Sequence, residues 1–448
     1  MKSKISISDH FNYGRLLRYT LPSVVMMVFT SLYTMVDGFF VSNFTGKVPF
    51  AAVNFIMPLL IIMGAVGMMF GTGGGALIAK TMGEGKNEKA NELFSMMIYV
   101  SIICGVILAL LGVIFIRPAA RLMGADGVLL ENSILYGRII LLALPFYILQ
   151  YGFQCLFATA GKPKLGLWVT VAAGITNMVL DALFVAVFSW GLAGAAIATA
   201  LSQFVGGVVP LIYFARKNTS SLKLVKCRFD GRALLKACTN GSSEFMSQIS
   251  ESFVGILYNI QLMKYVGEDG VAAYGVLMYV SFIFQSIFIG YSIGGAPIVG
   301  YHYGAANKDE LKNLRKRNLT VIAIASVLMV IAGQTLARPF SLIFVSYDAA
   351  LLEMTVHGFV IFSFSFLLSG ISIYSSSFFT ALNDGLTSAL ISFLRTFVFR
   401  CAAVLILPLM FGLDGIWLSV VVAEALAAVV TVGLLPQQQI TICRPVQT

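Results

Sequence analysis

The chain has 448 residues, of which 58% are hydrophobic and only 11% are charged, and its mean hydropathy is +0.89. Water-soluble domains carry about a quarter charged residues, so this composition excludes a soluble fold of this size. The net charge of +10 is compatible with a nucleic-acid partner. However, the charges lie in clusters between long apolar stretches, which favours a membrane protein.

The amino-terminal stretch MKSKISISDHFNYGRLLRYTLPS leads into an apolar segment. This segment is too long for the core of a cleavable signal peptide, and no small-residue cleavage site follows a short core. We therefore expect a cytoplasmic tail that leads into the first membrane span.

Twelve apolar segments follow, each with the length of about 20 residues that crosses a hydrocarbon core of about 30 Å as a helix. They lack the alternation over about ten residues that is typical of membrane barrels. The sequence therefore predicts an all-α polytopic membrane protein with twelve transmembrane helices. The predicted spans are 16–43, 50–79, 93–115, 130–156, 165–188, 191–215, 240–263, 271–301, 318–337, 350–381, 386–409 and 412–434.

The basic residues are distributed unevenly between the two sides of these spans. With the amino terminus inside, 22 Lys and Arg residues fall on the cytoplasmic side and only five fall outside. This bias follows the positive-inside rule and fixes the orientation. We expect a multi-pass protein of the cell (inner) membrane with cytoplasmic amino and carboxyl termini. The five outside residues are Lys47, Arg117, Arg121, Lys264 and Arg338.

The chain also matches itself at a constant offset of 221 residues. Gly74 aligns with Gly295, and Gly83 aligns with Gly304. Gly83 and Gly304 each open a charged loop. Much later, the sequence Gly-Leu-Ala-Gly at 191–194 aligns with Gly-Leu-Asp-Gly at 412–415. Chance similarity would not keep one offset over roughly 140 residues, so the chain contains an internal repeat.

Each copy of the repeat holds six spans, so the two copies have the same orientation in the membrane. Parallel repeats of this kind form two six-helix bundles related by a pseudo-twofold axis along the membrane normal, with a cleft between them. The predicted divisions are an N-terminal lobe (1–215), a cytoplasmic basic linker (216–240), a C-terminal lobe (241–434) and a C-terminal tail (435–448).

Four polar residues of the first lobe are expected at one depth in the membrane. Asn177 and Asp181 lie four residues apart on one face of the fifth span. Asp181 precedes the turn at Trp190 by nine residues and Thr199 follows it by nine, which places both about 13 Å inside the outer end. Asp37 lies at a similar depth in the first span. Two carboxylates, an amide and a hydroxyl supply the oxygen ligands of a hard cation.

The repeat provides an internal control for this cluster. At the offset of 221, Asp37 aligns with Tyr258, Asn177 with Val398, Asp181 with Ala402 and Thr199 with Val420. The second half is predicted to adopt the same fold without these polar groups, so folding alone does not require them. The alternative interpretation is a structural cluster of interhelical hydrogen bonds.

With the six-plus-six repeat and the G-x-x-G hairpin, this cluster resembles the multidrug and toxic compound extrusion (MATE) family, in particular its DinF-like and MepA-like branches more than its NorM-like branch. The resemblance covers nearly the whole chain. It implies that Asp37, Asn177, Asp181 and Thr199 match the coupling-cation site of the N-terminal lobe in the DinF-like branch. It also implies that Glu251 matches the seventh-span acid of the NorM-like branch.

The second lobe carries charged residues of its own, but its tenth span, FSFSFLLSGISIYSSSFFTAL, has no acid, which leaves open whether this lobe has a second cation site. Glu251 lies near mid-membrane as a candidate substrate or proton site, or as a buried, protonated hydrogen-bonding group. Glu424 is expected to serve packing. Arg395 and Arg400 pair with Glu251 or Glu424, or Arg395 extends towards the cytoplasm, and we interpret both as structural.

No pattern in the sequence indicates an enzyme. The six cysteines and three histidines are scattered, which fits neither a disulfide framework nor a metal cluster. The run Gly-Thr-Gly-Gly-Gly at 71–75 lacks the Lys-Ser/Thr of a phosphate loop and is expected to allow close helix packing instead. We expect no cofactor beyond a coupling sodium ion or proton, and no metal other than sodium at the cation site.

The predicted function is secondary active antiport that exports amphipathic, often cationic compounds in exchange for sodium ions or protons by alternating access. The expected partners are small organic substrates and the lipid bilayer, with no nucleic acid, and the expected state is a monomer. The alternatives are a lipid-linked precursor flippase of the same fold superfamily and a non-transporting membrane receptor or scaffold. The sequence leaves the coupling ion, the substrate and the role of the uncharged tail QQQITICRPVQT open.

Overall fold

The structure is a computed structural model that describes residues 5–346 and 348–443, and these residues form helices and connecting loops without a strand. The α-helices are α1 (Tyr13–Thr45), α2 (Lys47–Gly83), α3 (Asn87–Leu122), α4 (Gly127–Thr159), α5 (Pro163–Asp181), α6 (Gly191–Ala215), α7 (Gly231–Tyr265), α8 (Glu268–Gly304), α9 (Lys308–Val345), α10 (Ala349–Ser363), α11 (Ser365–Ala381), α12 (Gly385–Phe393) and α13 (Phe399–Cys443). Two π-helical segments, η1 (Ala182–Val187) and η2 (Leu394–Val398), continue α5 and α12. The all-α fold class is confirmed.

The elements correspond to the twelve predicted spans. Helices α1 to α9, with η1 added to α5, each match one span, and α10 and α11 form the tenth across a bend of 45°. The long helix α13 breaks at Gly412, whose φ of 59° and ψ of −132° separate the eleventh span from the twelfth. Within the described residues, length and apolar composition alone select nine spans, or ten with the bent pair. That count omits the more polar α7 and treats Gly385–Gln438 as one stretch.

Two boundaries differ from the sequence-based ones. Helix α7 begins at Gly231, inside the predicted linker, because the Asp230 side chain caps it by accepting hydrogen bonds from the backbone N–H groups of Arg232 and Ala233. Helix α13 continues to Cys443, past the predicted end of the last span at 434. The basic residues Lys2, Lys4 and Arg444, which contribute to the charge bias, lie outside the described residues.

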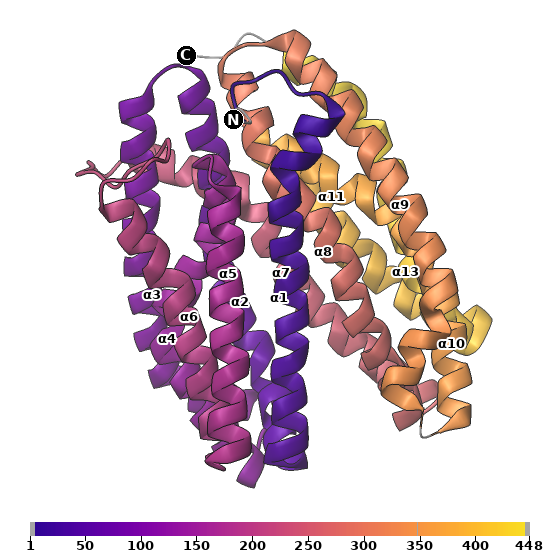
Figure 1. The fold of residues 1–448 in the computed structure, drawn as a ribbon. Coiled ribbons are helices and arrows are strands. Elements are labelled where there is room, and N and C mark those ends of the chain that lie inside the picture. Colours follow the sequence, from indigo (N-terminus) through magenta and orange to yellow (C-terminus); the bar gives the residue numbers. More distant parts are fainter. Residues whose placement is uncertain (1–4, 347, 444–448) are drawn as a thin grey trace.

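The two lobes pack against each other as two bundles, with α1 lying on α8 and α2 on α7 (Figure 1). Glycines permit this close approach and do so reciprocally. A Cβ added to Gly83 would lie 1.9 Å from the Tyr301 carbonyl oxygen, and one added to Gly304 would lie 1.9 Å from the Lys80 carbonyl oxygen. Both pairs are related by the 221-residue offset, so the contact has the symmetry of the repeat.

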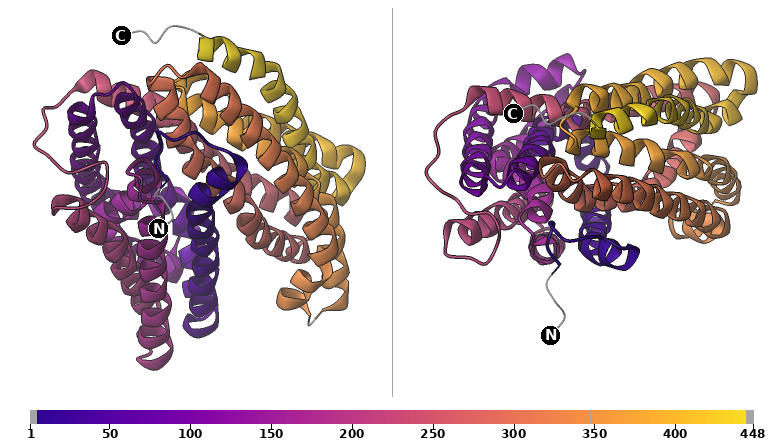
Figure 2. Two further views of the ribbon diagram at one scale, coloured as in Figure 1. Left: turned by 45° about the horizontal axis from the view of Figure 1, so that its top comes forward. Right: turned by 90° about the horizontal axis from the view of Figure 1, so that it is seen from above.

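The glycine run at 71–75 also serves packing, as predicted. A Cβ on Gly73 would lie 2.0 Å from the Ala237 carbonyl oxygen of α7, and one on Gly241 would lie 2.0 Å from the Met69 carbonyl oxygen of α2. These contacts hold the lobes together at the end of the molecule where α1 begins and α13 ends, here called the closed end, and the bundles diverge towards the opposite, open end (Figures 1 and 2).

The segment before α1 adds a further link between the lobes at this closed end. The Glu310 carboxylate at the start of α9 accepts hydrogen bonds from the Phe11 backbone N–H at 2.9 Å and from the Asn313 side chain at 3.0 Å. It also lies 2.5 Å from His10 Nδ1. The Phe11 side chain is fully buried, so the amino-terminal segment is packed against the second lobe.

Candidate functional site

Three helices of the N-terminal lobe bring the predicted cluster together. Thr199 on α6 donates a hydrogen bond from Oγ1 to Asp37 Oδ1 on α1 at 3.3 Å. Asn177 on α5 donates from Nδ2 to Thr199 Oγ1 at 3.5 Å. The Asp181 carboxyl group lies close enough to Asp37 for their charges to interact. The depth count from the sequence therefore grouped residues that do share one site.

The cluster is buried, and several of its oxygen atoms lack a partner. The exposed fractions are 8% for Asp37, 1% for Asn177 and 0% for Asp181. Among the described residues, neither carboxylate oxygen of Asp181 nor Oδ1 of Asn177 has a hydrogen-bond partner. Buried polar atoms are costly unless they are paired, so these oxygens are suited to a ligand with positive charge or a donor proton.

The chain changes its helical geometry at this cluster. Helix α5 ends at Asp181, and the π-helical segment η1 follows directly. The backbone of η1 ends in a turn in which Ser189 adopts a φ of 55°. Single π-helical turns occur frequently at functional sites because they shift side chains relative to a regular helix. Here the shift begins directly after Asp181, one of the two carboxylates of the cluster.

Sequence reasoning missed one neighbour of the cluster, Tyr136 on α4. Its side chain is fully buried, its hydroxyl has no hydrogen-bond partner among the described residues, and it lies within electrostatic range of both aspartates and close to Thr199. Tyr136 is six residues beyond the outer start of the predicted fourth span. The depth count that grouped the other residues would have found it if uncharged aromatic residues had been included.

Further along α4, towards the closed end, Tyr147, Gln150 and Tyr151 add polar groups to the interior of the lobe. Tyr147 Oη donates a hydrogen bond to Tyr151 Oη at 3.1 Å. Gln150 lies against Gly206 of α6, where an added Cβ would be 2.6 Å from the Gln150 amide carbon. The N-terminal lobe thus has a polar interior that extends from the aspartates towards the closed end.

The C-terminal lobe has a different interior. Arg395 Nε lies 3.1 and 2.9 Å from the two carboxylate oxygens of Glu424, and Arg400 Nη2 lies 3.0 Å from Glu424 Oε1. Both arginines therefore pair with Glu424, one of the two partners left open by the sequence. Tyr258, the equivalent of Asp37, lies 2.5 Å through Oη from Ser419 Oγ. None of these residues belongs to the predicted cation site.

Glu251 lies on α7, is partly exposed, and forms no direct ion pair with a described residue. On the same helix, Gln248 Nε2 lies 4.0 Å from Met68 Sδ of α2, so this face of α7 meets the other lobe. Glu251 is therefore placed beside the lobe interface, apart from the Asp37 cluster.

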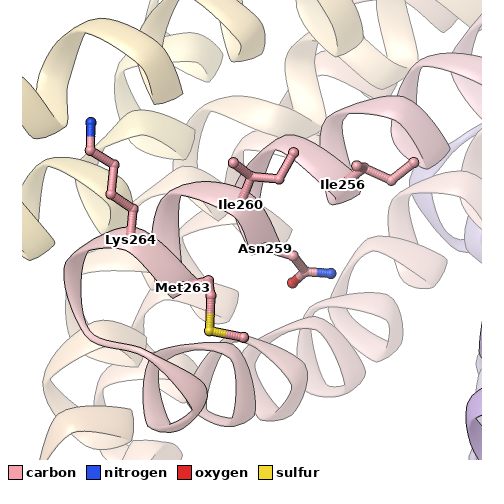
Figure 3. Close-up of a pocket in the computed structure, with 5 residues that line it drawn as sticks. All are labelled: Ile256, Asn259, Ile260, Met263 and Lys264. Atoms are coloured by element: carbon pink, nitrogen blue, oxygen red, sulfur yellow. The ribbon is translucent and has the colours of Figure 1, made fainter.

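Further out along α7, the same side of the helix is open. A groove of about 540 Å³ follows its outer half, and Figure 3 shows the side chains that line it. The lining residues are Ile256, Asn259, Ile260, Met263 and Lys264. Asn259 lies eleven residues after Gln248, which is close to three full turns, so it continues the face that contacts α2. The lobes touch along α7 at the closed end and separate along its outer half.

Comparison with known proteins places this architecture in a family. The family model described as MatE matches twice, over residues 22–183 and 245–406. The chain is 27% identical to the multidrug export protein MepA of Staphylococcus saprophyticus over 94% of this chain and 93% of the relative, and 25% identical to MepA of Staphylococcus aureus over 93% and 92%.

Solved structures agree on the fold. A multidrug resistance MATE family transporter in an outward-facing conformation is similar with a TM-score of 0.91 and 22% identity, covering 97% of both chains. A MOP superfamily transporter from Pyrococcus furiosus is similar with a TM-score of 0.90 and 21% identity, covering 97% of this chain and 98% of the other. Because the family model matches each of the two copies of the repeat, the chain belongs to the MatE family of multidrug efflux transporters.

Proposed function

We propose that this protein is a secondary active antiporter that exports small amphipathic, often cationic compounds by alternating access, in exchange for sodium ions or protons. The observation that carries the proposal is the buried cluster of Asp37, Asn177, Asp181 and Thr199, with unpartnered oxygens among the described residues. The repeat supports it, because the equivalent positions of the second lobe lack these groups.

The coupling cation binds between Asp37 and Asp181 in this proposal. Two carboxylates this close either hold a proton between them or share a metal ion, because two bare charges would repel each other. Thr199 and Asn177 contribute neutral oxygens, which suit sodium as a hard cation. Binding removes one of the two negative charges, and loss of the cation restores the repulsion, so the packing of α1 against α5 and α6 depends on occupancy.

The exported compound occupies the space between the lobes. The open groove along α7 offers apolar walls with a flexible Met263, which suits a binding site of broad specificity. The charge bias of the loops supports cytoplasmic termini in the cell membrane, and export then runs from the closed end towards the open one. The chain acts as a monomer and catalyses no chemical conversion in this proposal.

The test is efflux of a fluorescent cationic dye from vesicles that contain the purified protein, with sodium and proton gradients imposed separately. The proposal predicts that the sodium gradient, the proton gradient or both drive the dye against its own concentration gradient. Dye movement that only equilibrates under every gradient would refute antiport. Transport of a lipid-linked saccharide precursor in the same vesicles, without dye transport, would favour a flippase.

A further inference from the structure

The interior of the C-terminal lobe holds a charged cluster that the proposed coupling mechanism does not use. Glu424 accepts hydrogen bonds from Arg395 Nε and from Arg400 Nη2, with distances between 2.9 and 3.1 Å. Both arginines are 7% exposed and Glu424 is 1% exposed. Two cations and one anion leave this cluster with one positive charge in excess. An unbalanced charge inside a membrane costs several kcal/mol, so a further negative partner is required.

The guanidinium groups have donors available for that partner. Within the described part of the chain, Nη2 of Arg395 and Nε of Arg400 are buried and lack hydrogen-bond partners. Guanidinium groups bind carboxylates in preference to most other acceptors because their donors match the two oxygens. The unsatisfied donors and the excess charge both indicate a carboxylate.

Two carboxylates face this region, and both lie on α7. Helix α7 packs against η2 here, because the ring centroids of Phe253 on α7 and Phe397 on η2 lie 5.5 Å apart. In this packing the charge of Arg400 interacts with Glu251 as well as with Glu424, and Arg395 interacts with Glu244. The charges of Glu244 and Glu251 also interact with each other. Neither acid forms a direct ion pair with a described residue. Of the two, only Glu251 acts on Arg400, so its carboxylate is the one available to the free Nε of Arg400.

We propose that Glu251 is the counter-ion of Arg400, so that Arg395, Arg400, Glu424 and Glu251 form one neutral unit across α7, η2 and α13. Glu251 is then a specificity-determining residue whose charge is masked by an internal cation. A cationic compound reaches Glu251 only by displacing Arg400, whereas a neutral compound does not encounter this competition. The effect of Glu251 on substrate preference rests on the proposed transport function, whereas its pairing with Arg400 does not.

The test uses Glu251→Gln, Arg400→Gln and the double variant, with two readouts. Each single variant leaves one buried charge unbalanced, so its melting temperature in detergent falls by more than about 5 °C. The double variant is neutral again and recovers most of that loss. As a matched control, Glu251→Gln combined with Arg138→Gln also removes one negative and one positive charge, but Arg138 is exposed on α4. This pair should not recover.

The second readout is dye binding to the purified protein. Arg400→Gln unmasks Glu251, so a cationic dye binds roughly tenfold more tightly than to the wild type, while a neutral dye of similar shape binds equally. A purely structural role of Arg400 would not separate the two dyes. If Arg400→Gln does not fold, the double variant decides.

A double variant that melts as low as the worse single variant would overturn the inference, and so would equal binding of both dyes to Arg400→Gln. The melting measurements need no transport. A wild-type protein that fails to move dye against a gradient, while the double variant recovers its stability, would refute the proposed antiport and leave the role of Glu251 as counter-ion of Arg400 standing.

Discussion

Replacing the two neutral members of the cation site by valine separates sodium coupling from proton coupling. The double variant Asn177→Val and Thr199→Val keeps both carboxylates of Asp37 and Asp181 and removes only the neutral oxygens. The repeat shows that the frame accepts such residues, because Val398 and Val420 stand at the equivalent positions of the second lobe. The variant therefore tests ligands rather than folding.

The structure sets the expected cost in stability. The two hydrogen bonds that are lost measure 3.3 and 3.5 Å, which is long for side-chain bonds. Interhelical hydrogen bonds in membrane proteins contribute about 0.6 kcal/mol each on average. Asn177 Oδ1 is buried without a partner, and its removal offsets part of that loss. We expect a net destabilisation below about 2 kcal/mol.

The expected effect on the coupling ion is larger. A contact with a charged group contributes about 1.5 kcal/mol or more, so two lost sodium ligands reduce the apparent sodium affinity roughly a hundredfold. If the proton couples instead, transport persists with a shifted pH profile, because Asp37 and Asp181 remain. The assay is dye efflux from vesicles across a series of sodium concentrations and pH values, together with thermal unfolding.

Two results would refute this reasoning. A stable double variant that transports like the wild type under every gradient would remove Asn177 and Thr199 from the mechanism. A variant that does not fold would show that the cluster is structural.

Three further predictions concern topology and packing. A membrane-impermeant reagent should label a single cysteine at position 264 from outside, and one at position 226 only from inside. Labelling of position 226 from outside would show that the orientation is the reverse of the predicted one. Gly83→Ala should lower the melting temperature, because its Cβ would lie 1.9 Å from the Tyr301 carbonyl oxygen. The control Gly255→Ala, whose Cβ would have nothing within 4 Å, should leave it unchanged. Equal effects of the two substitutions would contradict the close contact between the lobes at Gly83. Glu310→Ala removes the acceptor of the Phe11 backbone N–H and should speed proteolysis of the amino-terminal segment. Unchanged cleavage would show that the remaining contacts hold the segment, namely the bond from Asn313 to the Phe11 carbonyl and the burial of the Phe11 side chain.

Much of the fold could be predicted because it depends on features that a sequence displays directly. Apolar length places the spans, and the offset of 221 predicts the two-lobe repeat, whose symmetry reappears in the contacts of Gly83 with Tyr301 and of Gly304 with Lys80. The bend between α10 and α11 and the π-helical segments could not be predicted. Such local changes in hydrogen-bond register leave no mark on composition or periodicity.

The candidate site divides in the same way. Asp37 and Asp181 stand out because charges inside spans are rare, and depth counting brings Thr199 to them. Tyr136 lies within electrostatic range of the aspartates but carries no charge, so its sequence position looks like that of an ordinary packing residue. The partner of the arginines depends on how α7 and α13 are rotated about their axes, and spacing along one helix does not contain that rotation. The choice of Glu424 therefore required the structure.

The most direct test of the account compares wild-type protein with Asp181→Asn in vesicles under the ion gradient that drives wild-type transport. We predict that the variant still binds the dye, as measured by fluorescence titration, and still lets it equilibrate, but no longer accumulates it against a gradient, because the site that senses the ion has lost one of its two carboxylates. Accumulation at the wild-type level would contradict the claim that the aspartates of the N-terminal lobe couple ion movement to export.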